Sequence, residues 1–203
     1  MSRENQICGV LDVQGFNVGK HFFTREIGFV NNDYVLCFEI KCNINKEVRE
    51  KNERTLSHQK WQIHGIPINP VLEDCSKRLV DCSKLNNLIE EIYCRVKTEN
   101  KPLIGIKNHF LAKILDEIEI PYFNFERERI GGESCPPLQL FDRFHKDPFC
   151  RLHSVLAPGV LVNHYRCALR KSSNIWEWLE NKNKSDIFFD EIHGRIENSF
   201  SVL

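Results

Sequence analysis

The chain has 203 residues, enough to bury one sizeable hydrophobic core, and its 28 basic residues balance its 28 acidic residues. A balanced chain has no overall field that attracts nucleic acid, so any such affinity must come from a local basic patch. The sequence shows neither the long apolar run of a membrane span nor the start of a secretory signal, which predicts a location in the cytosol, the nucleus or both. In that setting the nine cysteines predict reduced thiols or metal ligands rather than disulfides.

The first third of the chain predicts an antiparallel meander of three strands. Runs rich in β-branched and aromatic residues alternate with turn-forming residues there. The expected strands cover residues 7–13, 21–30 and 34–42, and the expected turns cover 14–20 and 31–33. The polar segment that follows, residues 43–62, predicts a loop that includes a short helix.

The remainder alternates helices with strands. Apolar residues at helical spacing predict helices over 83–97 and 108–118, with Ser83 and Asn108 as N-caps. Further expected elements are strands over 101–106 and 120–126, a charged loop over 126–134 and two helical pieces within 164–182.

This order predicts an α/β fold of the RNase H-like type, a mixed sheet flanked by helices as in the DEDD exonucleases. We expect one such domain over residues 1–182 and a peripheral C-terminal tail over residues 183–203.

The catalytic carboxylates of a DEDD exonuclease are degenerate in this sequence. Such enzymes hold two divalent metals with an Asp-x-Glu on the first strand and with later aspartates. Asp12 stands at the first position, but Gln14 replaces the glutamate, and His109 and Cys167 stand where later aspartates are expected. One carboxylate cannot hold two magnesium ions, so we expect no conventional exonuclease and assign no catalytic residue.

A cluster of cysteines and histidines near the end of the chain predicts a metal site. Cys150 and His153 lie three positions apart, and Cys167 follows fourteen positions later. Thiolate and imidazole suit tetrahedral zinc, although buried cysteines and hydrogen-bonded histidines give the same pattern. Spacing alone leaves the fourth ligand open among His164, Cys135, His145 and a carboxylate.

Four short motifs, taken in order, resemble the Maelstrom domain of the piRNA-silencing pathway. They are TREIGFV (24–30), HGIPI (64–68), CRLH (150–153) and RCALRK (166–171), and the resemblance covers about residues 7 to 180. It implies an RNase H-like fold without DEDD carboxylates and a Glu-Cys-His-Cys metal set formed by Glu26, Cys150, His153 and Cys167. A closed set of four ligands implies a structural zinc.

The resemblance also implies a function. A stand-alone Maelstrom-like domain is expected to bind single-stranded RNA in piRNA or transposon silencing, together with protein partners of that pathway. The family implies a weak endoribonuclease activity as well. A basic patch for RNA phosphates is expected near the metal set, formed by Arg143, Lys146, Arg151, Arg166, Arg170 and Lys171.

Two alternatives remain open at this level. The balanced charge favours an inactivated nuclease fold that serves as a scaffold for protein–protein interaction. A divergent metal-dependent exonuclease would combine Asp12 with Asp116 or Asp142. Among other candidates, we expect His64 to be held by the backbone, and Trp176 and Trp178 to pack in the core rather than stack on bases.

Overall fold

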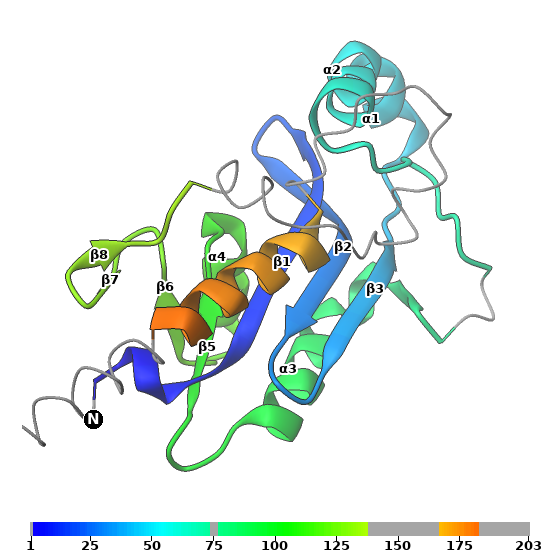
Figure 1. Ribbon diagram of the computed structural model, residues 1–203. Helices are drawn as coiled ribbons and strands as arrows, with labels where there is room; N and C mark the ends of the chain where they lie inside the picture. Colours follow the sequence, from blue (N-terminus) through cyan, green and yellow to red (C-terminus); the bar gives the residue numbers. More distant parts are fainter. Residues whose placement is uncertain (1, 74–76, 138–166, 183–203) are drawn as a thin grey trace, which may run out of the picture.

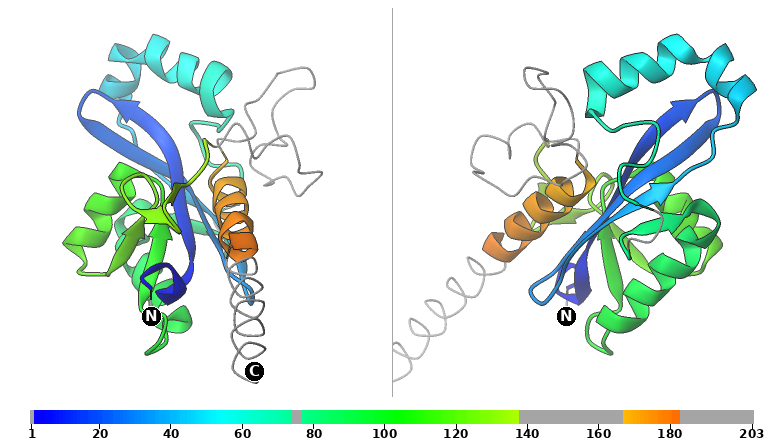
Figure 2. Two further views of the ribbon diagram at one scale, coloured as in Figure 1. Left: turned by 60° about the vertical axis from the view of Figure 1, so that its left-hand side comes forward. Right: turned by 90° about the vertical axis from the view of Figure 1, so that its right-hand side faces the viewer.

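The computed structural model describes residues 2–73, 77–137 and 167–182. It is a mixed α/β fold in which a six-stranded sheet lies between helices on both faces (Figures 1 and 2). Residues 168–182 form the last described helix, called helix 168–182 below and drawn in orange. Within the described residues, no helix is long and apolar enough to cross a membrane.

The sheet has the strand order β4-β3-β2-β1-β5-β6. Its centre is an antiparallel meander, and the outer strands run parallel to their inner neighbours. The strands are β1 (Ile7–Val18), β2 (His21–Val30), β3 (Val35–Lys41), β4 (Leu79–Asp81), β5 (Leu103–Ile106) and β6 (Tyr122–Asn124).

Each face of the sheet has its own hydrophobic core. Helices α3 (Leu85–Val96) and α4 (His109–Glu117) cover one face, where Leu11, Ile27 and Ile89 are buried. Helix 168–182 covers the opposite face, where it packs on Val10 and Val30 with Ile175, Trp176 and Leu179.

Smaller elements complete the described chain. Helices α1 (Lys46–Lys51) and α2 (Glu53–His58) lead into a π-helical turn (Gln59–His64). These elements lie beside the end of the hairpin at which β1 turns into β2. Two 3-10 turns (Glu4–Gln6 and Cys82–Lys84) precede β1 and α3. The hairpin of β7 (Arg129–Ile130) and β8 (Glu133–Ser134) lies within the segment expected to be a loop.

The expected meander, both central helices and the strands that follow each of them are confirmed, but the turn expected over residues 14–20 is confined to Gly19 and Lys20. β1 continues to Val18, and its register with β2 shifts between Gln14 and Gly15. Arg25 is the extra residue of this β-bulge, which bends the hairpin without ending it. A Cβ on Gly15 would lie 2.0 Å from the Phe23 carbonyl oxygen, so glycine permits this close pairing.

The capping residues were predicted with mixed success. Asn108 caps α4, because its side chain accepts from the backbone N–H of Phe110 and of Leu111. Ser83 is not the cap expected for α3. The N-cap position of α3 is Lys84, whose side chain makes no capping hydrogen bond. Asp81 caps the 3-10 turn that leads into the helix, where its carboxylate accepts from the N–H and hydroxyl of Ser83.

Candidate functional site

Helix 168–182 encloses two acidic side chains of the sheet. Six of its buried residues recur at helical spacing: Ala168, Lys171, Ser172, Ile175, Trp176 and Leu179. Leu169 and Asn174 are buried as well. Gly28 permits the close approach, because a Cβ there would lie 2.4 Å from the Leu169 nitrogen. The Ser172 hydroxyl donates to the Gly28 carbonyl at 2.9 Å. We call the enclosed group of Asp12, Glu26, Asn108, Cys167 and Lys171 the buried polar centre.

Glu26 contacts the beginning of helix 168–182. Its carboxylate is fully buried, and Oε2 accepts the backbone N–H of Ala168 at 2.9 Å. Oε1 accepts from the Cys167 thiol at 3.3 Å and from the Cys37 thiol at 3.7 Å. The carboxylate therefore meets an N–H that has no partner within the helix, at the positive end of the helix dipole.

Two members of the predicted ligand set thus come together from positions 141 residues apart. Cys37 on β3 joins them, and no sequence pattern singled it out. Among the residues that the structure describes, no group of three or more His, Cys, Asp and Glu side chains is arranged to hold a metal ion. The other predicted ligands, Cys150 and His153, lie outside the described residues.

Asp12 forms the second half of the buried polar centre. Its Oδ2 lies 2.5 Å from the ammonium of Lys171, and the two side chains are 0% and 8% exposed. Its Oδ1 accepts from the Asn108 side-chain amide at 3.1 Å and from the Val13 N–H at 2.7 Å. Asn108 also donates to the Val13 carbonyl, so the residue that caps α4 is hydrogen-bonded to β1.

The electrostatics of Asp12 follow from this enclosure. Burial raises the pKa of the Asp12 carboxyl, and the Lys171 ammonium and the hydrogen bonds from Asn108 and Val13 oppose that rise. A buried ion pair of this kind keeps both charges only while both partners remain. The ammonium occupies a place beside Asp12 that a metal cation would otherwise need.

Most of the predicted RNA contacts lie outside the described residues, namely Arg143, Lys146, Arg151 and Arg166. Arg170 is half-buried on helix 168–182. Lys171 is 6% exposed, and its ammonium faces a carboxylate inside the protein rather than solvent. This lysine therefore serves the fold and not the expected phosphate patch.

The carboxylates proposed for a divergent exonuclease do not meet Asp12 in the described chain. Asp116 is exposed near the end of α4, about 12 Å along the helix from Asn108, and it accepts a hydrogen bond from Tyr122. His109 is exposed at the start of the same helix. Asp142 lies outside the described residues.

Other candidates have the structural roles expected for them. The His64 ring is buried, and its Nδ1 accepts the Ile66 N–H at 3.1 Å. Trp176 is 7% exposed within the core, and its Nε1 donates to Asn32. Arg25, the residue before Glu26, forms a fully buried ion pair with Glu39 at 2.7 Å.

An exposed aromatic surface around the π-helical turn was missed. Trp61 remains 39% exposed, and the Lys60 ammonium lies 4.2 Å from its ring centroid. A hollow of about 370 Å³ adjoins it, lined in part by Arg49, Glu53 and Asn69. Residues 46–61 contain five basic and three acidic side chains, a local excess that the neutral whole chain conceals.

Comparisons with known proteins found no relative of this chain. No protein-family model, no curated protein and no solved structure matches the chain.

Proposed function

We propose that this chain is a zinc-stabilised, RNase H-like domain of Maelstrom type that binds single-stranded RNA and has lost two-metal hydrolysis. The observation that carries the proposal is the ion pair between Asp12 and Lys171. A lysine ammonium neutralises the one acidic side chain that matches the exonuclease pattern on the first strand. The degenerate site then has a structural role, because its ion pair joins β1 to helix 168–182.

The strand order and directions support the RNase H-like part of this proposal. An antiparallel meander leads into helix-linked strands that run parallel to β1, and the helices divide between the two faces. Glu26 on β2 pairs in register with Gln14 on β1, beside the position where an exonuclease would carry its glutamate. Both acidic side chains of the buried polar centre are therefore near that position.

One pair of donors, at Glu26 and Cys167, has a separation compatible with zinc ligation. In a tetrahedral site with Zn–S near 2.3 Å and Zn–O near 2.0 Å, ligating sulfur and oxygen atoms are about 3.5 Å apart. Glu26 Oε1 and Cys167 Sγ are separated by 3.3 Å. Oε2 keeps its hydrogen bond to Ala168, as ligating carboxylates commonly do. Cys150 and His153 would complete the set, and a closed set would stabilise the fold rather than activate water.

Metal analysis tests this proposal. Mass spectrometry of the purified protein should find about one zinc per chain, and the Cys150→Ser/Cys167→Ser double variant should lose both the zinc and thermal stability. Cys82→Ser/Cys94→Ser is the matched control, since both thiols are free and exposed, and it should keep both. Wild-type protein without zinc, or a double variant that retains it, would contradict the predicted ligand set.

The Trp61 surface supports RNA binding within the described residues. A base can stack on an exposed indole, and nearby cations can hold the adjoining phosphates. Lys60 and Arg49 both line the hollow and could take this role, although Arg49 also donates to Asn69 at 3.0 Å. Recognition of this kind is expected to depend on salt and to tolerate different base sequences.

Fluorescence anisotropy with a labelled oligouridine checks RNA binding. Loss of one stacked base costs about 1–3 kcal/mol, so Trp61→Ala should weaken binding roughly 5- to 150-fold. Tyr34→Ala removes another exposed aromatic ring, from the β2–β3 turn, and should leave the affinity unchanged. Absence of RNA affinity at low salt would remove RNA from the proposed function and favour a protein-interaction scaffold.

A further inference from the structure

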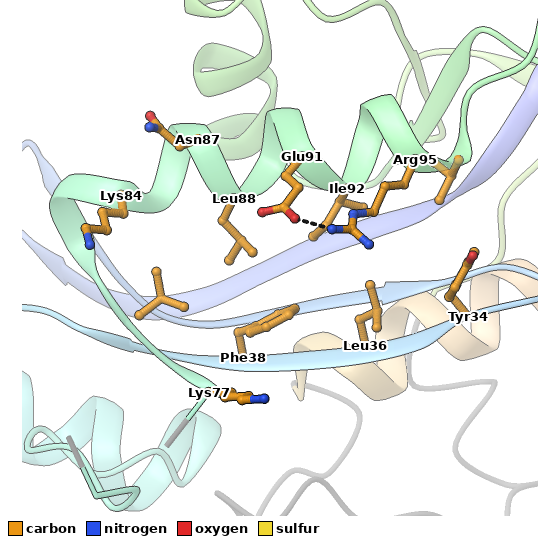
Figure 3. A pocket seen from close by; sticks show the side chains of 12 residues that line it. Tyr34, Leu36, Phe38, Lys77, Lys84, Asn87, Leu88, Glu91, Ile92 and Arg95 are labelled. Atoms are coloured by element: carbon orange, nitrogen blue, oxygen red, sulfur yellow. Dashed lines mark hydrogen bonds and ion pairs between the residues drawn. The ribbon is translucent and has the colours of Figure 1, made fainter. Parts of the chain in front are cut away.

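A groove lies between α3 and the outer edge of the sheet, on the face opposite helix 168–182 (Figure 3). Its volume is about 430 Å³, within the range of about 300–1,000 Å³ typical of binding sites. Half-buried apolar side chains from three elements line it: Leu36, Phe38, Val80, Leu88 and Val96.

Strand β3, which lines this groove, forms the edge of the sheet over the first half of its length. β4 pairs only with residues 39–41 of β3, so no described strand lies beside the residues before them. The Asn31 N–H bonds to the Tyr34 carbonyl, which places Tyr34 and every second residue after it in hydrogen-bonded pairs with β2. The N–H and C=O of Val35 therefore point away from β2, and Val35 is 64% exposed.

The rim of the groove carries positive charge. Lys77 and Lys84 lie near one end, as Figure 3 shows, and both are exposed. The Arg95 guanidinium is near the other end, 2.6 Å from Glu91, the single acidic side chain among the described residues that line the groove. A second copy of this chain, paired across a twofold axis, would bring the same cations face to face, so the charge favours an acidic partner.

We propose that this groove binds an extended acidic peptide of another protein, which adds a strand to the free edge of β3. Its alternate apolar side chains would face the floor between Leu36 and Leu88, and the acidic residue at the end of the peptide beside β4 would meet Lys77 and Lys84. Lys84 and Val96 are about 18 Å apart along α3, a length that five or six residues of extended chain cover. Edge-strand addition gives affinity through the main chain and specificity through alternate side chains.

The probe is a fluorescein-labelled hexapeptide with alternating Glu and Val or Phe residues, titrated with the full chain and followed by anisotropy. We expect saturable binding that weakens roughly tenfold in the Lys77→Glu/Lys84→Glu variant, because each reversal places a carboxylate against the peptide. Lys20→Glu/Lys113→Glu makes the same change at exposed lysines elsewhere and should bind as the wild type does. Both variants change surface side chains, so folding is preserved.

Two further peptides decide the mode of binding. A peptide with Lys in place of Glu should not bind, and N-methylation of the central amides should abolish binding by blocking main-chain hydrogen bonds. Equal binding of the lysine peptide, or full binding of the methylated one, would overturn the proposal. So would a concentration-dependent dimer in sedimentation that the Lys77→Glu/Lys84→Glu variant disrupts, because the groove would then join two copies of the chain.

Discussion

Lys171→Met should destabilise the protein by about 3–5 kcal/mol, measured by chemical denaturation at neutral pH. The substitution keeps an unbranched apolar side chain in the helix but removes the ammonium 2.5 Å from Asp12 Oδ2. The buried carboxylate would then retain only its hydrogen bonds to Asn108 and Val13. A large effect is expected because an unpaired charge, and not a cavity, is left inside the protein.

The pH dependence of this variant has a defined sign. Burial already raises the pKa of Asp12 in the folded protein, and loss of the ammonium should raise it further. A group with a raised folded-state pKa contributes stability that is complete below its unfolded pKa and is lost as pH rises through its folded pKa. The stability difference between wild type and Lys171→Met should therefore be largest at neutral pH and shrink toward acid pH.

Two matched variants separate charge from packing. The Asp12→Asn/Lys171→Met double variant removes both charges and should recover much of the lost stability. Lys182→Met breaks an ion pair on the same helix, with Glu133 at 2.6 Å, but its side chains are 29% and 62% exposed, so a cost of about 0–1 kcal/mol is expected. If the double variant is no more stable than Lys171→Met alone, uncompensated charge is not the cause.

Local patterns were sufficient for the central elements of the fold. Leu85, Ile89 and Ile92 recur at helical spacing and are the buried residues of α3, and the Asn108 side chain caps α4 as its position predicts. The turn was predicted five residues too long, over 14–20 instead of 19–20, because Gly15 and Asn17 suit a turn but also tolerate a bulged strand. Only the pairing with β2 decides between the two, and that pairing is a tertiary contact.

The candidate site was less accessible to sequence reasoning. Glu26 and Cys167 came from a motif resemblance, since no periodicity links residues 141 positions apart. The pairing of Asp12 with Lys171 was missed, although a signal existed. Lys171 stands on the buried stripe of its helix between Ala168 and Ile175, where a lysine needs an acidic partner. It was instead grouped by proximity in sequence with Arg170, which lies one helical position away.

Gly28→Ala should cost about 3 kcal/mol or more and loosen helix 168–182 from the sheet. The added Cβ would lie 2.4 Å from the Leu169 nitrogen and 2.5 Å from its Cα. These are backbone atoms, so relief requires movement of the helix and not of a flexible side chain. We expect faster hydrogen exchange over residues 168–182 and greater exposure of Trp176, in addition to the loss of stability.

Gly19→Ala is the control for the conformational effect of adding a methyl group. Gly19 has φ +62°, and no atom lies within 4 Å of the position that an alanine Cβ would take, so only backbone strain of about 1–2 kcal/mol is expected. Because Gly28 permits the start of the helix to approach Glu26, its substitution should also lower the zinc content if Glu26 and Cys167 are ligands. Unchanged zinc with a displaced helix would mean that Glu26 acts as a helix cap, and the metal would have to be held elsewhere.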